Sequence, residues 1–149
     1  MAETDLIKLY SGRILELAAD IPRTGRLEAP QASATQRSAL CGSNITVDVV
    51  VENGQITDFA QDVRACALGQ AAASVVGANI LGCTLAQIKD TRAALDKMLT
   101  ADGPPPAAPF DELEVLIPAR AFQNRHLSIL LALDATAEAM EQAQRAACA

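Results

Sequence analysis

The side chains of this chain best suited to soft-metal binding or sulfur chemistry are its four cysteines and its one histidine. Cys41 lies in a short Leu-Cys-Gly-Ser bend, and Cys66 follows two strand-like segments and precedes a run of helix-forming residues. The two thiols therefore flank one predicted hairpin and are expected at the same edge of a sheet. Cys66 would also lie in the positive field of a helix N-terminus, which favours the thiolate. A metal ligand, a sulfur nucleophile and a buried small side chain all remain open for these positions.

The remaining cysteines and the histidine carry a weaker signal. Cys83 lies among apolar residues between two predicted helices, which favours simple packing. Cys148 is the penultimate residue, and no role is assigned to it. His126 opens the last predicted helix, and a lone histidine is more often an ordinary surface or core residue than a metal ligand. The sequence contains no Cys-x-x-Cys pair, no His-Glu-x-x-His motif and no glycine-rich phosphate loop.

The segments between the first two cysteines have the pattern of a small antiparallel sheet. Apolar residues alternate with polar ones from Ile45 to Val51, which is typical of a half-buried strand. Asn53-Gly54 favours a tight turn, and residues 56–63 form the returning strand. A further strand is expected around residues 35–40. The sheet therefore has about three strands.

Helices are expected before and after this sheet. Tyr10, Ile14 and Leu17 recur at helical spacing and predict an amphipathic helix from about residue 5 to residue 20. Further helices are expected over residues 67–81, over 85–99 with Thr84 as the cap, and from Leu127 to about Met140. The proline-rich segment 102–109 fits neither helix nor strand, residues 110–118 read as a turn, and the tail 141–149 is expected to fray.

This order predicts an α+β fold, in which the N-terminal helix and several C-terminal helices pack on one face of the small antiparallel sheet. A length of 149 residues fits a single domain over residues 1–149 and allows a core without disulfides. The 18 acidic and 12 basic side chains give a net charge of −6, which argues against nucleic acid and anionic membranes as partners. With no leader or spanning segment in the sequence, a cytoplasmic location is expected.

The chain resembles the U-type iron–sulfur cluster assembly scaffolds, a family that comprises IscU, SufU and the N-terminal part of NifU. The shared features are an N-terminal Leu6-Ile7-Lys8-Leu9-Tyr10 helix, Cys41-Gly42 before an alternating strand, the Asn53-Gly54 hairpin, the Cys66-Ala67-Leu68 helix start, and the run from Ser128 to Ala135. The resemblance covers nearly the whole chain. The long segment between Cys66 and Ser128 is similar to that of the SufU type.

Two ligand positions depart from the family pattern, and Arg64-Ala65 replaces the usual glycine before Cys66. Ser43 stands where family members carry an aspartate, and Ser128 stands where they carry a third cysteine. The resemblance implies that Cys41 and Cys66 bind the cargo, with His126 as a candidate replacement for the missing cysteine. A serine hydroxyl is a poor ligand for iron or zinc, so Ser43 and Ser128 are weak candidates. The implied cargo is a transient iron–sulfur cluster, such as a two-iron two-sulfur cluster, or a single iron or zinc ion.

Three functions follow from this resemblance. The first is a scaffold that holds a cluster or metal at Cys41, Cys66 and His126. The second is a SufE-like or SufU-like acceptor, in which Cys41 takes persulfide sulfur from a cysteine desulfurase. The third is a regulator of that system that has kept the fold and lost the metal chemistry. The implied partners are a cysteine desulfurase and the recipient or carrier iron–sulfur proteins.

Overall fold

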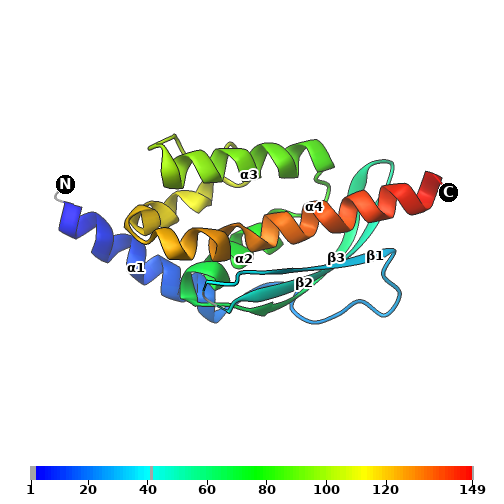
Figure 1. The fold of residues 1–149 in the computed structure, drawn as a ribbon, viewed down its shortest axis with the longest axis horizontal. Coiled ribbons are helices and arrows are strands. Elements are labelled where there is room, and N and C mark those ends of the chain that lie inside the picture. The colour runs from blue at the N-terminus through cyan, green and yellow to red at the C-terminus, as the bar shows by residue number, and fades with distance from the viewer. Residues whose placement is uncertain (1–2, 41, 149) are drawn as a thin grey trace.

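The structure is a computed structural model that describes the backbone of residues 3–40 and 42–148 and the side chains of residues 10–40 and 42–146. It contains the three-stranded sheet predicted from the sequence. All neighbouring strands are antiparallel, in the order β1-β2-β3 (Figure 1). The strands are β1 (Ala32–Arg37), β2 (Asn44–Glu52) and β3 (Gln55–Arg64). The α+β class expected from the sequence is confirmed.

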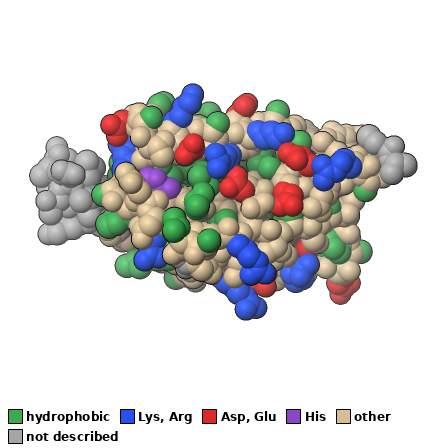
Figure 2. Space-filling model, in the orientation of Figure 1, with side chains coloured by type: hydrophobic (Ala, Val, Ile, Leu, Met, Phe, Trp, Pro, Cys, Tyr) green, Lys and Arg blue, Asp and Glu red, His purple; other side chains and the backbone are tan. Residues whose placement is uncertain are grey.

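The helices lie on one side of this sheet, in two layers (Figure 1). They are α1 (Glu3–Ala19), α2 (Ala67–Asn79), α3 (Leu85–Thr100), the 3₁₀ segments η1 (Asp111–Ala121) and η2 (Gln123–Arg125), and α4 (His126–Cys148). α4 packs on β1 and β2, α2 packs on β3, and α3 covers α4 from the other side. α1 packs on α2 and η1. The visible helical surface carries both signs of charge in alternation (Figure 2).

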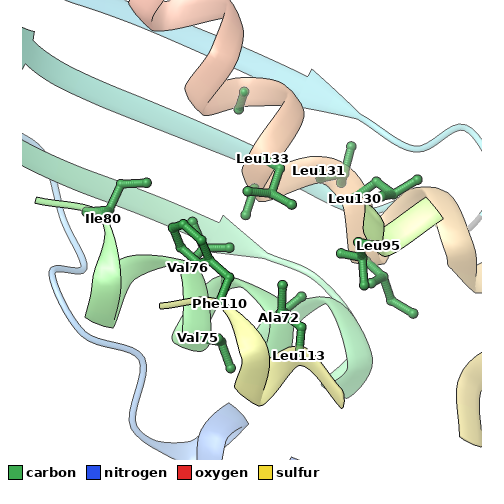
Figure 3. Packing of buried hydrophobic residues seen from close by; sticks show 14 of the residues in the cluster. Ala72, Val75, Val76, Ile80, Leu95, Phe110, Leu113, Leu130, Leu131 and Leu133 are labelled. Carbon is green, nitrogen blue, oxygen red and sulfur yellow. The ribbon is translucent and has the colours of Figure 1, made fainter. Parts of the chain in front are cut away.

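The core lies between the sheet and the helices. Ile45, Val47 and Val49 point from β2 toward α4 and are fully buried. Ala72 and Val76 of α2 meet Leu133 of α4 in the same core (Figure 3). Small alanine side chains along α2 allow this close approach between helix and helix.

Two local signals in the sequence have the structures they predict. Asn53 and Gly54 both have positive φ, at 54° and 78°, as a tight turn between twisted strands requires. Thr84 caps α3 through a capping box, in which its hydroxyl accepts from the Gln87 backbone N–H and its own N–H donates to the Gln87 side chain.

The first strand begins and ends three residues earlier than expected. It covers Ala32–Arg37 instead of residues 35–40. The chain leaves the sheet at Ser38, whose backbone N–H donates to the Ser43 carbonyl at 2.8 Å while its own carbonyl accepts from Gly42 at 2.9 Å. Gly42 has φ of 69°, which closes this connection. Residues 38–40, 42 and 43 therefore belong to a tight connection between β1 and β2.

The C-terminal third is more helical than expected. The tail that was expected to fray continues α4 as far as Cys148, because Ala139, Met140 and Ala143 are fully buried and hold it on the body. Of residues 110–118, expected as a turn, 111–118 belong to η1, where Leu113 and Leu116 are fully buried. No helix in the described part of the chain is long and apolar enough to cross a membrane.

A buried carboxylate fixes the connection between α1 and β1. Asp48 on β2 is inaccessible to solvent, and it accepts two hydrogen bonds from Arg26, at 2.7 and 2.9 Å, and one from Ser33 at 2.6 Å. The backbone N–H of Leu27 donates to the same carboxylate at 3.0 Å. Burial would raise the pKa of Asp48, but the hydrogen bonds and charge of Arg26, with those of Ser33 and Leu27, outweigh it and lower the pKa.

Candidate functional site

Three of the positions singled out in the sequence meet at one end of the sheet. Cys66 stands at the N-cap position of α2, Ser43 directly precedes β2, and Ser128 lies in the first turn of α4. The Cys66 Sγ lies 3.6 Å from the Ser128 Oγ, and the Ser128 hydroxyl donates to the Ser43 Oγ at 2.9 Å. Ser43 and Ser128 are buried, whereas Cys66 is half-buried. The fold thus joins one thiol and two hydroxyls in a chain of hydrogen bonds.

Gly69 on α2 makes this arrangement possible. A Cβ at this position would lie 2.5 Å from the Ser128 Oγ, 2.9 Å from the Ala65 Cβ and 3.1 Å from the Ser128 carbonyl oxygen. The glycine therefore lets the first turns of α2 and α4 approach closely enough for Ser128 to reach Cys66.

The surroundings of Cys66 favour its thiolate. Partial burial raises the pKa of the Cys66 thiol, but this effect is outweighed by the backbone N–H of Gly69, the Ser128 hydroxyl, the backbone N–H of Leu68 and the positive charge of Arg125, so the pKa is lowered. The sulfur makes no close capping hydrogen bond, so the helix N–H groups act on it from a distance. While the single Ser128 hydrogen is donated to Ser43, the Ser128 oxygen accepts from the Cys66 thiol, and it donates to the thiolate when that hydrogen turns from Ser43 to the sulfur.

Cys41, the other predicted thiol of the site, lies outside the described residues. Its two neighbours in the sequence are Leu40, which is exposed, and Gly42, which has a positive φ. Gly42 and Ser43 line a shallow hollow together with Arg37, Ser38 and Ala39. The role of Cys41 therefore stays a prediction from the sequence.

His126 is buried at the start of α4, two residues before Ser128. Its Nε2 lies 2.9 Å from the Ala119 carbonyl oxygen. Because a carbonyl oxygen only accepts, Nε2 carries the hydrogen and is unavailable to a metal in this arrangement. Any ligand bond from this histidine would have to use Nδ1, so its role as a metal ligand stays a prediction.

Cys83 and Cys148 lie apart from this cluster. Cys83 is buried between α2 and α3, its Sγ donates to the Asn79 carbonyl at 3.3 Å, and burial raises its pKa. The side chain of Cys148 lies outside the described residues. Among the residues that the structure describes, no three His, Cys, Asp or Glu side chains converge as a metal site would require. The described donors at the site are one sulfur and two hydroxyl oxygens, which suit sulfur chemistry better than a tetrahedral metal.

Two arginines near the site were not singled out in the sequence. Arg125 acts on Cys66 by its charge, and Arg37 shares the hollow beside Ser43. Arg125 lies three residues before Ser128, about one helical turn, so its spacing was a usable signal. Arg37 had no such signal, because its place beside Ser43 depends on where β1 ends.

The fold and this end-of-sheet cluster define a class of protein. It is a small α+β domain with a thiol site where a hairpin meets two helices. The family model described as the NifU-like N terminal domain matches residues 9–110. The chain therefore belongs to the NifU-like N-terminal domain family. No protein of curated function matches the sequence.

Solved structures agree with this assignment. A nitrogen-fixing NifU-like protein (N-terminal) from Brucella abortus is 41% identical, with a TM-score of 0.89, and the match covers 97% of this chain and 99% of that one. A hypothetical protein is 21% identical, with a TM-score of 0.80 over 90% of this chain and 98% of that one. An iron–sulfur cluster assembly scaffold protein for the SUF system from Fervidobacterium islandicum is 17% identical, with a TM-score of 0.74 over 89% and 97% of the two chains. The last two show likeness of fold.

Proposed function

We propose that this chain takes part in iron–sulfur cluster assembly and that it carries sulfur on the thiols of its site, Cys66 and Cys41. Membership of the NifU-like family supports the assembly role. The observation that supports sulfur carriage is the neighbour of Cys66: its Sγ lies 3.6 Å from the Ser128 hydroxyl. The family resemblance would place a third metal ligand at that position, and a hydroxyl is a poor one. A thiol with a lowered pKa and hydroxyl neighbours is equipped as a nucleophile.

The proposed step is a transfer of sulfane sulfur. A thiolate of this chain attacks the outer sulfur of a cysteine persulfide on the donor protein, here a cysteine desulfurase. A new sulfur–sulfur bond forms on this chain as the donor's sulfur–sulfur bond breaks, and the donor cysteine leaves as its thiolate. No external oxidant or reductant is needed. The loaded chain then passes the sulfur to a recipient or carrier iron–sulfur protein by the same exchange.

Transfer from a desulfurase can be followed by mass. Incubation of the chain with a purified cysteine desulfurase and cysteine should add the mass of one or more sulfur atoms to Cys66 or Cys41 and should raise the turnover of the desulfurase. Cys83→Ala serves as the matched control, because Cys83 lies buried away from the site. Absence of a mass increase on both site cysteines, with no change in turnover, would contradict sulfur carriage.

Retention of a cluster or metal at Cys41, Cys66 and His126 is the second candidate function. It is favoured by the position of His126, two residues before Ser128 at the same helix start. Anaerobic reconstitution with iron and sulfide tests it through the visible absorption of the product. A coloured product that is lost in both Cys66→Ala and His126→Ala would support it, and a colourless product from correctly folded protein would contradict it.

A further inference from the structure

The last row of paired residues in the sheet, beside the site, carries two arginines on the face without helices. Arg37 of β1 pairs with Asn44 of β2, and Asn44 pairs with Arg64 of β3. Paired residues of antiparallel strands project to the same face, so Arg37 and Arg64 stand on one face about 10 Å apart, two strand spacings.

The neighbouring residues show which face this is. Gln36 reaches α4, where its side chain donates to Glu138 at 2.6 Å, and Ile45 is fully buried beneath the helices. The residues next to them in sequence, Arg37 and Asn44, therefore project to the opposite face. The Arg64 side chain is 73% exposed, and Arg37 is exposed as well. We refer to Arg37 and Arg64 as the arginine pair.

Little negative charge opposes the arginine pair. Among the described residues, no carboxylate lies within ion-pair distance of Arg37. Arg64 has Asp62 at 3.9 Å, a solvent-exposed contact of the kind that contributes little. Asp48, on the same face, is already neutralised by Arg26. Figure 2 shows several Lys or Arg side chains along the lower edge of the molecule, on the side where Figure 1 places the sheet, with acidic side chains among them and further basic ones over the helices.

The arginine pair adjoins the thiol site. Arg37 lines the same hollow as Ser43, whose hydroxyl is bonded to Ser128, and Arg64 precedes Cys66 by two residues. A local excess of positive charge at the site contrasts with a net charge of −6 for the whole chain. Such a placement attracts an acidic surface to one end of an otherwise acidic molecule and orients it there.

We propose that the arginine pair docks an acidic surface that surrounds the reactive cysteine of the sulfur-donating protein. This inference rests on the proposed sulfur-carrying function. The partner is a protein with carboxylates beside its persulfide, and the pair aligns that persulfide with the thiols of this chain. Two exposed guanidinium groups act here mainly on the rate of association, and their effect weakens as salt screens them.

The test compares sulfur loading of wild type with loading of Arg37→Glu/Arg64→Glu, using a purified cysteine desulfurase from the same cell as donor. Loading of the variant should be at least about tenfold slower at low ionic strength. The two rates should converge to within about twofold in 0.5 M salt, where the screening length is only a few ångströms. Lys97→Glu/Arg145→Glu is the control, because it makes the same change in net charge at exposed positions on other elements.

A low-molecular-weight persulfide separates this inference from the proposed function. It should load wild type and the Arg37→Glu/Arg64→Glu variant equally, which also shows that the variant site is intact. If neither donor loads wild type, the sulfur-carrying function is wrong. If the small persulfide loads wild type and the desulfurase does not, or if the arginine variant and the control are loaded by the desulfurase at the wild-type rate, the docking role of the arginine pair is wrong.

Discussion

At the scale of single residues, the described donors of the site are one thiol and two hydroxyls. Ser43 and Ser128 contribute hydroxyls, which are weak ligands for iron or zinc, and their Oγ atoms lie 2.9 Å apart. Because the Cys66 Sγ lies 3.6 Å from Ser128, stronger ligands at these positions would converge on one point. Whether this site can bind a metal therefore depends on the chemistry of these two side chains, since the backbone already brings them together.

This leads to a gain-of-binding prediction. Ser43→Asp/Ser128→Cys should retain about one zinc ion per chain after purification, because it offers a carboxylate and a thiolate next to Cys66. Metal analysis against wild type measures this. The same two substitutions combined with Cys66→Ala should lose the metal. A folded Ser43→Asp/Ser128→Cys protein without bound zinc would show that these side chains do not converge as the distances indicate.

The two described cysteines should differ in reactivity. Cys66 is half-buried and its pKa is lowered, whereas Cys83 is buried and its pKa is raised. At neutral pH, iodoacetamide should therefore modify Cys66 at least about tenfold faster than Cys83 in the folded protein, because the thiolate is the attacking species. Peptide mass spectrometry after timed quenching gives both rates. Equal rates in the folded protein, or a faster Cys83, would contradict this assignment.

At the scale of secondary structure, the site depends on how closely α2 and α4 approach. Gly69→Ala should lower the free energy of unfolding by about 1–3 kcal/mol, because the added Cβ overlaps the Ser128 side chain and Ala65. Gly12→Ala is the matched control: this helical position has nothing within 4 Å of an added Cβ, so the change should be neutral or stabilising by up to about 1 kcal/mol. Chemical denaturation measures both. Equal effects of the two substitutions would contradict the packing role of Gly69.

Sequence patterns predicted correctly those elements whose conformation depends on residues close together in the sequence. The Asn53-Gly54 turn and the Thr84 cap are correct because each depends on residues within one turn of the chain. The limits of β1 were wrong because they depend on how the loop to Ser43 closes. The helical tail of α4 was missed because burial of alanines against the body stabilises it, and sequence periodicity there is weak.

The site was predicted in part for the same reason. Cys66 could be placed at a helix start from its neighbours alone. Its contact with Ser128, 62 residues away, depends on tertiary packing, and so does the bond between Ser128 and Ser43, which are 85 residues apart. The Nε2 contact of His126 with Ala119 likewise follows from the η1 segment, which the sequence did not indicate as helical.

At the scale of the whole molecule, the Asp48 network links stability to pH. The pKa of this buried carboxyl is lowered in the folded chain, so the unfolded chain binds its proton more readily. Its contribution to stability is therefore present above the ordinary aspartate pKa of about 3.9 and is lost as the pH falls through and below that value.

Asp48→Asn should lower the free energy of unfolding by about 2 kcal/mol at pH 7, because the donors of Arg26, Ser33 and Leu27 lose a charged acceptor. The loss is not larger because the Arg26 side chain is more than half exposed. The difference from wild type should persist from pH 8 to about pH 5 and shrink toward pH 3. Thermal or denaturant unfolding across this range measures it, with the exposed Asp90→Asn as control. A difference that grew on acidification would contradict the stated sign.

The chain of hydrogen bonds from Cys66 through Ser128 to Ser43 has a thermodynamic consequence. It closes only when the loop before β2, the start of α2 and the start of α4 have all reached their final places. A cargo that needs these three segments together binds the folded chain and not the unfolded one, so it shifts the folding equilibrium by mass action. Loading and unloading of the site are therefore coupled to the stability of the whole molecule, and the empty chain is the form more readily unfolded.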